Sequence, residues 1–173
     1  MLKTEQAGPV RFLVVNRPDK LNAFQGLALL WHDHWSLAHE IAQSREGRPD
    51  HDLLHAILHR REGDFANAGY WFRRAGKHAC YPILERGLAS ADPERFRAPV
   101  DPGGGPAAMP ARPAPAVPAL PGMEGGRWSP SVFLAAVQSR VESGEGETGG
   151  GSGVLRRIQA EEFRAFALHL LSA

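Results

Sequence analysis

Residues 50–76 read DHDLLHAILHRREGDFANAGYWFRRAG, and this pattern predicts two helices joined by a tight turn. Apolar residues recur at helical spacing on either side of Gly63. Gly63 suits the left-handed position that ends a helix, and Asp64 suits the cap that begins the next. We therefore expect one helix over 51–62 and a second that ends near Gly76, packed antiparallel because the connection is short.

The residues before this hairpin predict one longer helix. Asn22 lies three residues before Gln25, which is the spacing of a capping box, and apolar residues follow at helical period to about Gln43. A short turn then leads into the next helix, which Asp50 is expected to cap. Residues 10–15 have the composition of a strand, but no partner strand is visible, so helix dominates.

Composition marks a linker after the hairpin. Residues 98–126 contain eight of the fourteen prolines and six glycines, interspersed with alanine, which predicts an extended, disordered segment. A second break, with six glycines, covers residues 142–153. Two helices are expected after the linker, from Ser129-Pro130 and from about Val154. Neither could bury its apolar face alone, so we expect both to pack back onto the hairpin.

The predicted fold is all-α, an antiparallel hairpin or bundle of about five helices. Residues 1–97 form its N-terminal helical region, and residues 127–173 hold the two C-terminal helices. The single cysteine, Cys80, excludes a disulfide framework, and the formal net charge of +1 gives no general attraction to nucleic acid or anionic membranes. The longest apolar runs are too short to cross a bilayer. We expect a cytoplasmic protein without membrane association.

Histidines are concentrated in the hairpin region, where seven of the eight lie between His32 and His78. Side chains on one strip of the helix over 51–62, within about 80° of arc, are those of His51, His55, His59 and Glu62. Folding the preceding helix back antiparallel brings His39 level with His55. One seam between the two helices would then carry several imidazoles.

Such a seam suits a metal. Neutral imidazole and carboxylate bind zinc, iron, nickel or manganese, and helical bundles hold metals between facing helices. The sequence thus predicts a divalent transition metal as cofactor. Its ligands would be His39, His55 and His59, with His32 as a secondary candidate. Glu62 would act as ligand or general base. The alternative is that these histidines are solvated or hydrogen-bonded to neighbours.

Two runs, HRRE at 59–62 and YWFRR at 70–74, combine arginine with aromatic residues. Arginine can form two hydrogen bonds to a carboxylate or phosphate and can stack on a ring. In one interpretation the arginines pair internally with carboxylates. In the other, a small anionic ligand such as phosphate is held by Arg60, Arg73, Arg74 and Tyr70. Residues 27–90 hold eight Lys/Arg against eight Asp/Glu, so no nucleic-acid surface is expected.

No nucleophile-elbow, HExxH, Walker or dinucleotide-binding motif occurs in the chain. The first functional hypothesis is therefore a small helical binding module, whose Arg/His/aromatic surface contacts a protein partner or a small anionic ligand. The second is a metal-dependent, hydrolase-like enzyme with its site between the first two helices. The third is a structural subunit that associates through its apolar C-terminal helix.

Residues 55–62, HAILHRRE, followed by Asp64, Asn67 and residues 70–74, resemble an uncharacterised family of helical bacterial proteins. The resemblance extends to Trp128 and to RIQAE at 157–161. The chain departs from the family pattern at three positions, which are Gly63, where proline is expected, Ala79, and Phe163, where tryptophan is expected. The family has no known activity, so the resemblance supports the domain boundaries and implies no function.

Overall fold

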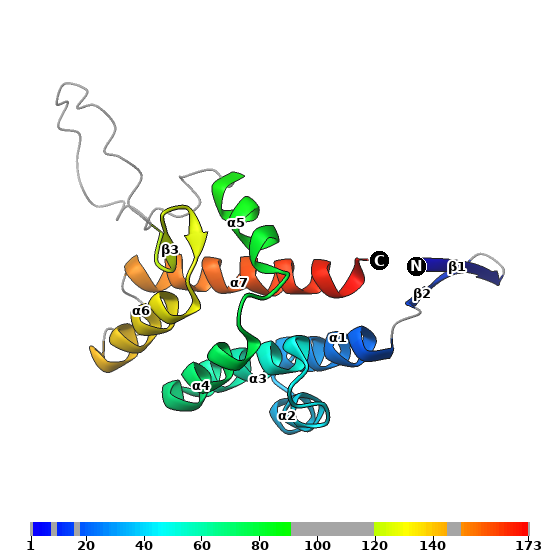
Figure 1. The fold of residues 1–173 in the computed structure, drawn as a ribbon, viewed down its shortest axis with the longest axis horizontal. Coiled ribbons are helices and arrows are strands. Elements are labelled where there is room, and N and C mark those ends of the chain that lie inside the picture. Colours follow the sequence, from blue (N-terminus) through cyan, green and yellow to red (C-terminus); the bar gives the residue numbers. More distant parts are fainter. Residues whose placement is uncertain (1, 8–9, 16–17, 91–119, 145–149, 173) are drawn as a thin grey trace, which may run out of the picture.

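The computed structural model describes residues 2–7, 10–15, 18–90, 120–144 and 150–172. The expectation of an all-α fold is confirmed, with seven helices and two small antiparallel hairpins among these residues (Figure 1). The helices are α1 (Pro18–Trp31), α2 (Trp35–Gln43), α3 (Pro49–Glu62), α4 (Phe65–Ala75), α5 (Tyr81–Ser90), α6 (Pro130–Glu142) and α7 (Gly150–Leu171).

The turn between α3 and α4 forms as the sequence predicts. Gly63 has a left-handed backbone (φ 85°), and the amides of Gly63 and Asp64 bond back to carbonyls in the last turn of α3. Asp64 then caps α4 by accepting a hydrogen bond from the Asn67 amide at 3.1 Å. At the other end of α3, Arg48 is the capping residue and Pro49 the first helical residue, so the expected cap at Asp50 is wrong.

The single helix expected over 22–43 is two helices, α1 and α2. The chain leaves α1 in a Schellman motif, with the His34 amide bonded to the Leu29 carbonyl and the Asp33 amide to the Leu30 carbonyl. Asp33 occupies the left-handed position of this motif (φ 60°), where glycine is usual. Helical periodicity continues across the break, so the pattern of apolar residues did not indicate it.

Other elements also differ from the sequence expectations. Residues 10–15 do have a partner, since β1 (Leu2–Ala7) pairs antiparallel with β2 (Val10–Val15). Helix α5 had not been expected. The predicted linker, 98–126, falls largely outside the described residues, but its last part contains a turn and β3 (Met123–Glu124), which pairs with β4 (Arg127–Trp128) directly after it. Helix α7 begins at Gly150, inside the predicted glycine-rich break.

Helix α3 lies at the centre of the helical body and packs against α1, α2 and α4. Figure 1 shows α7 along the length of this body, between α5 on one side and α1 on the other, and α6 contacts α4. The core includes large, fully buried side chains from most helices, namely Leu30, Leu53, Leu54, Ile57, Leu58, Leu84, Phe133, Ile158, Phe166 and Leu170. Among the described residues, no helix combines the length and the apolar character that a bilayer crossing requires.

Substitutions at two glycines can measure how much the left-handed backbone of the α3–α4 turn contributes to the free energy of unfolding. A Cβ added at Gly63 or at Gly153 would meet no atom within 4 Å, but only Gly63 has a positive φ. Gly63→Ala is therefore expected to lower the free energy of unfolding by about 1 kcal/mol. Gly153→Ala, inside α7, is expected to raise it by about 0.5 kcal/mol. Urea unfolding measures both, and equal effects would contradict the interpretation.

Candidate metal centre

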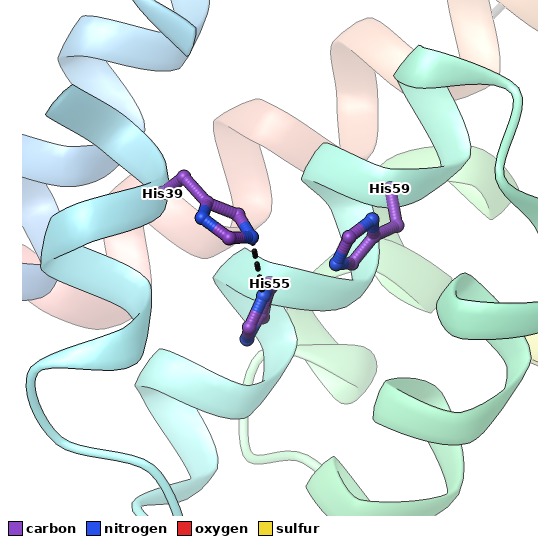
Figure 2. A group of neighbouring side chains, drawn as sticks. All are labelled: His39, His55 and His59. Carbon is purple, nitrogen blue, oxygen red and sulfur yellow. Dashed lines mark hydrogen bonds between the residues drawn. The ribbon is translucent and has the colours of Figure 1, made fainter. Parts of the chain in front are cut away.

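Three imidazoles from two helices converge beside the centre of the fold. His39 comes from α2, and His55 and His59 come from consecutive turns of α3. Figure 2 shows the three rings turned toward one another, and one ligand atom from each lies within 4.8 Å of the others. The Nε2 atoms of His39 and His55 are 3.0 Å apart. The structure thus brings together three of the residues that the sequence nominated.

His55 is the most enclosed of the three, with 2% of its surface exposed. Its ring stacks on Trp71 of α4, with centroids 4.0 Å apart and planes at 22°, and also stacks on His59, with centroids 4.8 Å apart and planes at 21°. Burial, together with the nearby His59, His39 and Arg74, lowers the pKa of His55 to about 4. The ring is therefore neutral at pH 7 and has a lone pair to offer.

The close approach of two Nε2 atoms has two chemical readings. Either one proton is shared between the rings, or both lone pairs point at a cation. Two nitrogens bound to one tetrahedral zinc ion at 2.0–2.1 Å lie about 3.3 Å apart. The observed separation of 3.0 Å is close to that spacing. The His39 and His55 nitrogens thus lie near the spacing of two zinc ligands, whereas the His59 ring, stacked on His55, would have to turn for all three to bind one ion.

Glu62 lies on the remote side of His59. Its Oε2 is 3.1 Å from His59 Nδ1, and an Asp64 carboxylate oxygen is 4.0 Å from the same nitrogen. The geometry is that of a close charge contact and not of a hydrogen bond, and the negative charge favours the tautomer with the proton on Nδ1 and the lone pair on Nε2. Glu62 is not one of the three convergent groups, so its position suits orientation of a ligand better than the roles of ligand or general base.

Two further histidines that the sequence analysis considered, His32 and His51, lie outside this cluster. His32 is exposed in the turn after α1, because the helix ends before it reaches the seam. His51 is buried near the start of α3, and neither of its ring nitrogens has a hydrogen-bond partner among the described residues. Burial lowers the pKa of His51. The group of convergent rings therefore consists of His39, His55 and His59, and it includes neither His32 nor His51.

The residues proposed to hold an anion are not gathered in one place. Arg60 is buried, and both its terminal nitrogens bond to the carboxylate of Glu162 on α7, at 3.2 and 2.5 Å. Arg74 donates to the Tyr70 hydroxyl, lies over the Trp71 ring, and approaches Asp52 at 3.6 Å. The Tyr70 hydrogen bond raises the pKa of Arg74.

The described contacts therefore agree with internal pairing for Arg60 and Arg74. Arg73 is exposed on α4. Because Arg60 is enclosed in the core and Arg73 lies at the surface, the structure does not unite them in one ligand site.

A second group, not anticipated from the sequence, is centred on Asp50. Its Oδ1 accepts hydrogen bonds from Nε2 of His78 at 3.0 Å and from Nε2 of His169 at 2.9 Å. Burial raises the pKa of Asp50, but the hydrogen bonds from the two histidines, with the nearby charge of His169, outweigh it and hold that pKa well below its usual value. The group links the start of α3 to the end of α7, 119 residues later.

The tautomer of His78 makes this second group a poor metal site. The Cys80 amide donates to His78 Nδ1 at 3.2 Å, so Nδ1 carries a lone pair and Nε2 carries the proton. That proton is directed at Asp50, where a metal would have to bind. No sequence signal could have identified this group, because His169 is isolated from the other histidines along the chain.

Comparisons of the chain with protein-family models, with curated proteins and with solved structures find no match. The resemblance to a family of helical bacterial proteins stays a prediction.

The Asp50 group is expected to stabilise the fold in a pH-dependent way. A carboxyl whose pKa is lowered by folding adds stability above its unfolded pKa of about 3.9, and this stability is lost as the pH falls below it. Asp50→Asn is expected to lower the free energy of unfolding by about 1 to 2 kcal/mol at pH 7. Urea unfolding between pH 7 and 3 should show this difference shrinking below about pH 4.

Glu124→Gln is the control, because Glu124 is exposed in the β3–β4 hairpin. A difference for Asp50→Asn that stayed constant down to pH 3 would contradict the role assigned to the carboxylate.

Proposed function

We propose that this protein binds a divalent transition-metal ion, zinc in the first instance, through His39, His55 and His59. The observation that carries the proposal is the convergence of three imidazole nitrogens within 4.8 Å, two of them 3.0 Å apart. Three histidines are a ligand set that zinc accepts, with water as the fourth ligand. The low pKa of His55 supports the proposal because no proton competes with the metal for that ring at pH 7.

A water molecule as the exchangeable fourth ligand would allow the bound metal to take part in a reaction. Zinc lowers the pKa of its bound water, and the resulting hydroxide attacks esters and other electrophilic carbonyl or phosphoryl groups. The chemistry that we propose for the centre is therefore metal-dependent hydrolysis. His59 and Glu62 would contribute a ligand and the carboxylate that orients it.

The alternative of a binding module with an arginine-rich contact surface has less support. Arg60 is enclosed in an ion pair with Glu162, and Arg74 is engaged by Tyr70, Trp71 and Asp52. Such internal pairing leaves less reason to invoke an external anion.

Zinc binding is expected to depend on His55 and not on His32. Protein freed of any affinity tag and of metal should bind one Zn²⁺ per chain in calorimetry. His55→Ala should weaken that binding at least tenfold, since it removes the central ligand. His32→Ala, which removes an exposed histidine outside the cluster, is the matched control and should bind as the unmodified protein does.

Two further readouts belong to the same experiment. Trp71 stacks on His55, so its fluorescence should change on binding of Co²⁺, in step with the absorption of the cobalt complex. The zinc-loaded protein should hydrolyse p-nitrophenyl acetate faster than the His55→Ala variant. Absence of zinc binding at micromolar concentration, or equal binding by His55→Ala, would overturn the metal site. Binding without hydrolysis would overturn the hydrolytic chemistry alone.

Glu62 is expected to tune the affinity without being a ligand. Glu62→Ala removes the carboxylate beside His59 Nδ1 and should weaken zinc binding about 10- to 100-fold, while the stoichiometry stays at one. Glu40→Ala is a suitable control, because Glu40 is an exposed carboxylate next to His39. Calorimetry distinguishes the two, and unchanged affinity in Glu62→Ala would exclude the orienting role.

A further inference from the structure

Arg61 of α3 joins the end of α1, the start of α2 and the side of α7. Its Nη1 donates to the Leu30 carbonyl at 2.5 Å, and its Nη2 donates to the Asp33 carboxylate at 2.7 Å. The guanidinium lies over the ring of Trp35 at 5.1 Å and over that of Phe163 at 5.6 Å. One side chain thus contacts both sides of the break between α1 and α2.

These contacts act on the turn where α1 ends. Carbonyl groups in the last turn of a helix carry partial negative charge, which a cation stabilises. Asp33 holds a left-handed backbone that costs a non-glycine residue about 1 kcal/mol. Its carboxylate is 67% exposed, so its ion pair with Arg61 contributes little alone. The same guanidinium also bonds to the Leu30 carbonyl and lies over Trp35, so these two contacts hold the end of α1 and the start of α2 relative to α3.

Helix α2 packs against α1 and α3, with the larger side chains of Trp35 and Ile41 partly buried against the core. It is nine residues long, too short to be stable by itself, and its buried residues are the small side chains of Ala38 and Ala42. His39 lies about one helical turn after Trp35, the residue on which Arg61 rests. The placement of Trp35 therefore sets the placement of His39.

We propose that Arg61 is the positioning residue of the three-histidine centre, because it fixes α2 so that His39 meets His55 and His59. The inference rests on the proposed metal site for its function, but the positioning of His39 can be tested without metal. Arg61 follows His59 by two residues on the same helix. Helix α3 therefore supplies two ligands directly and sets the third one through Arg61.

The first test uses the metal-free protein. NMR of the unmodified chain should show a nuclear Overhauser contact between the ring protons of His39 and His55, whose Nε2 atoms are 3.0 Å apart. Arg61→Met keeps the aliphatic stem and removes the guanidinium, and the contact should be lost or strongly weakened. Arg61→Lys keeps the charge and should restore part of it. Retention of the full contact in Arg61→Met would overturn the inference, whatever the metal result.

The second test is a double-mutant cycle on metal affinity. Arg61→Met should weaken zinc binding at least tenfold in the unmodified chain but have little further effect in a His39→Ala background. X-ray absorption at the zinc edge should report two imidazoles in Arg61→Met and three in the unmodified protein. Equal effects of Arg61→Met in the two backgrounds, or three imidazoles in the variant, would overturn the positioning role.

A control separates positioning from general loss of stability. Val137→Ala removes buried methyl groups from α6, which packs against α4, and should lower stability without changing the number of imidazoles on the metal. If Val137→Ala also removed an imidazole, the effect of Arg61 would be ordinary destabilisation. Failure of the unmodified chain to bind zinc would overturn the metal site, while the metal-free NMR result would still decide the role of Arg61.

Discussion

The burial of α3 on nearly every side is the constraint on which the arrangement of the other helices depends. A helix at the centre of a bundle has little solvent face for its polar side chains, so burial favours partners on neighbouring segments, and His51 is the exception among the described residues. The contacts that meet this need are Asp50 with His78 and His169, Asp52 with the Gly47 amide, His55 with His39, Arg60 with Glu162, and Arg61 with the Leu30 carbonyl.

The most fully enclosed of these ion pairs is between Arg60 and Glu162, whose side chains are 1% and 0% exposed. Both carboxylate oxygens are bonded, and the guanidinium lies over the rings of Phe72 and Phe133. Removing one member of such a pair leaves an uncompensated buried charge, which commonly costs about 3 to 5 kcal/mol. With the bond between Asp50 and His169, it ties α7 to α3 at two points along its length.

The two histidine groups on α3 differ in where their protons can be. At the Asp50 group, the Cys80 amide occupies His78 Nδ1 and forces the Nε2 proton toward the carboxylate, which produces a hydrogen-bonded link between helices. At the other group, the carboxylate of Glu62 lies 3.1 Å from Nδ1 of His59, and its charge favours the tautomer whose other nitrogen has the lone pair. Histidine therefore stabilises the packing of helices in the Asp50 group and has the protonation that metal binding needs in the three-histidine group.

The sequence by itself determined the α3–α4 hairpin, because its signals are local: Gly63 supplies the left-handed turn and Asp64 the cap. It also brought His39 level with His55, since helical period and a short connection fix which residues face each other. Only the tertiary structure decided the break at Asp33, the link to His169 and the enclosure of Arg60. These depend on partners far away in the chain, and periodicity within one segment carries no information about which distant residue will meet a buried charge.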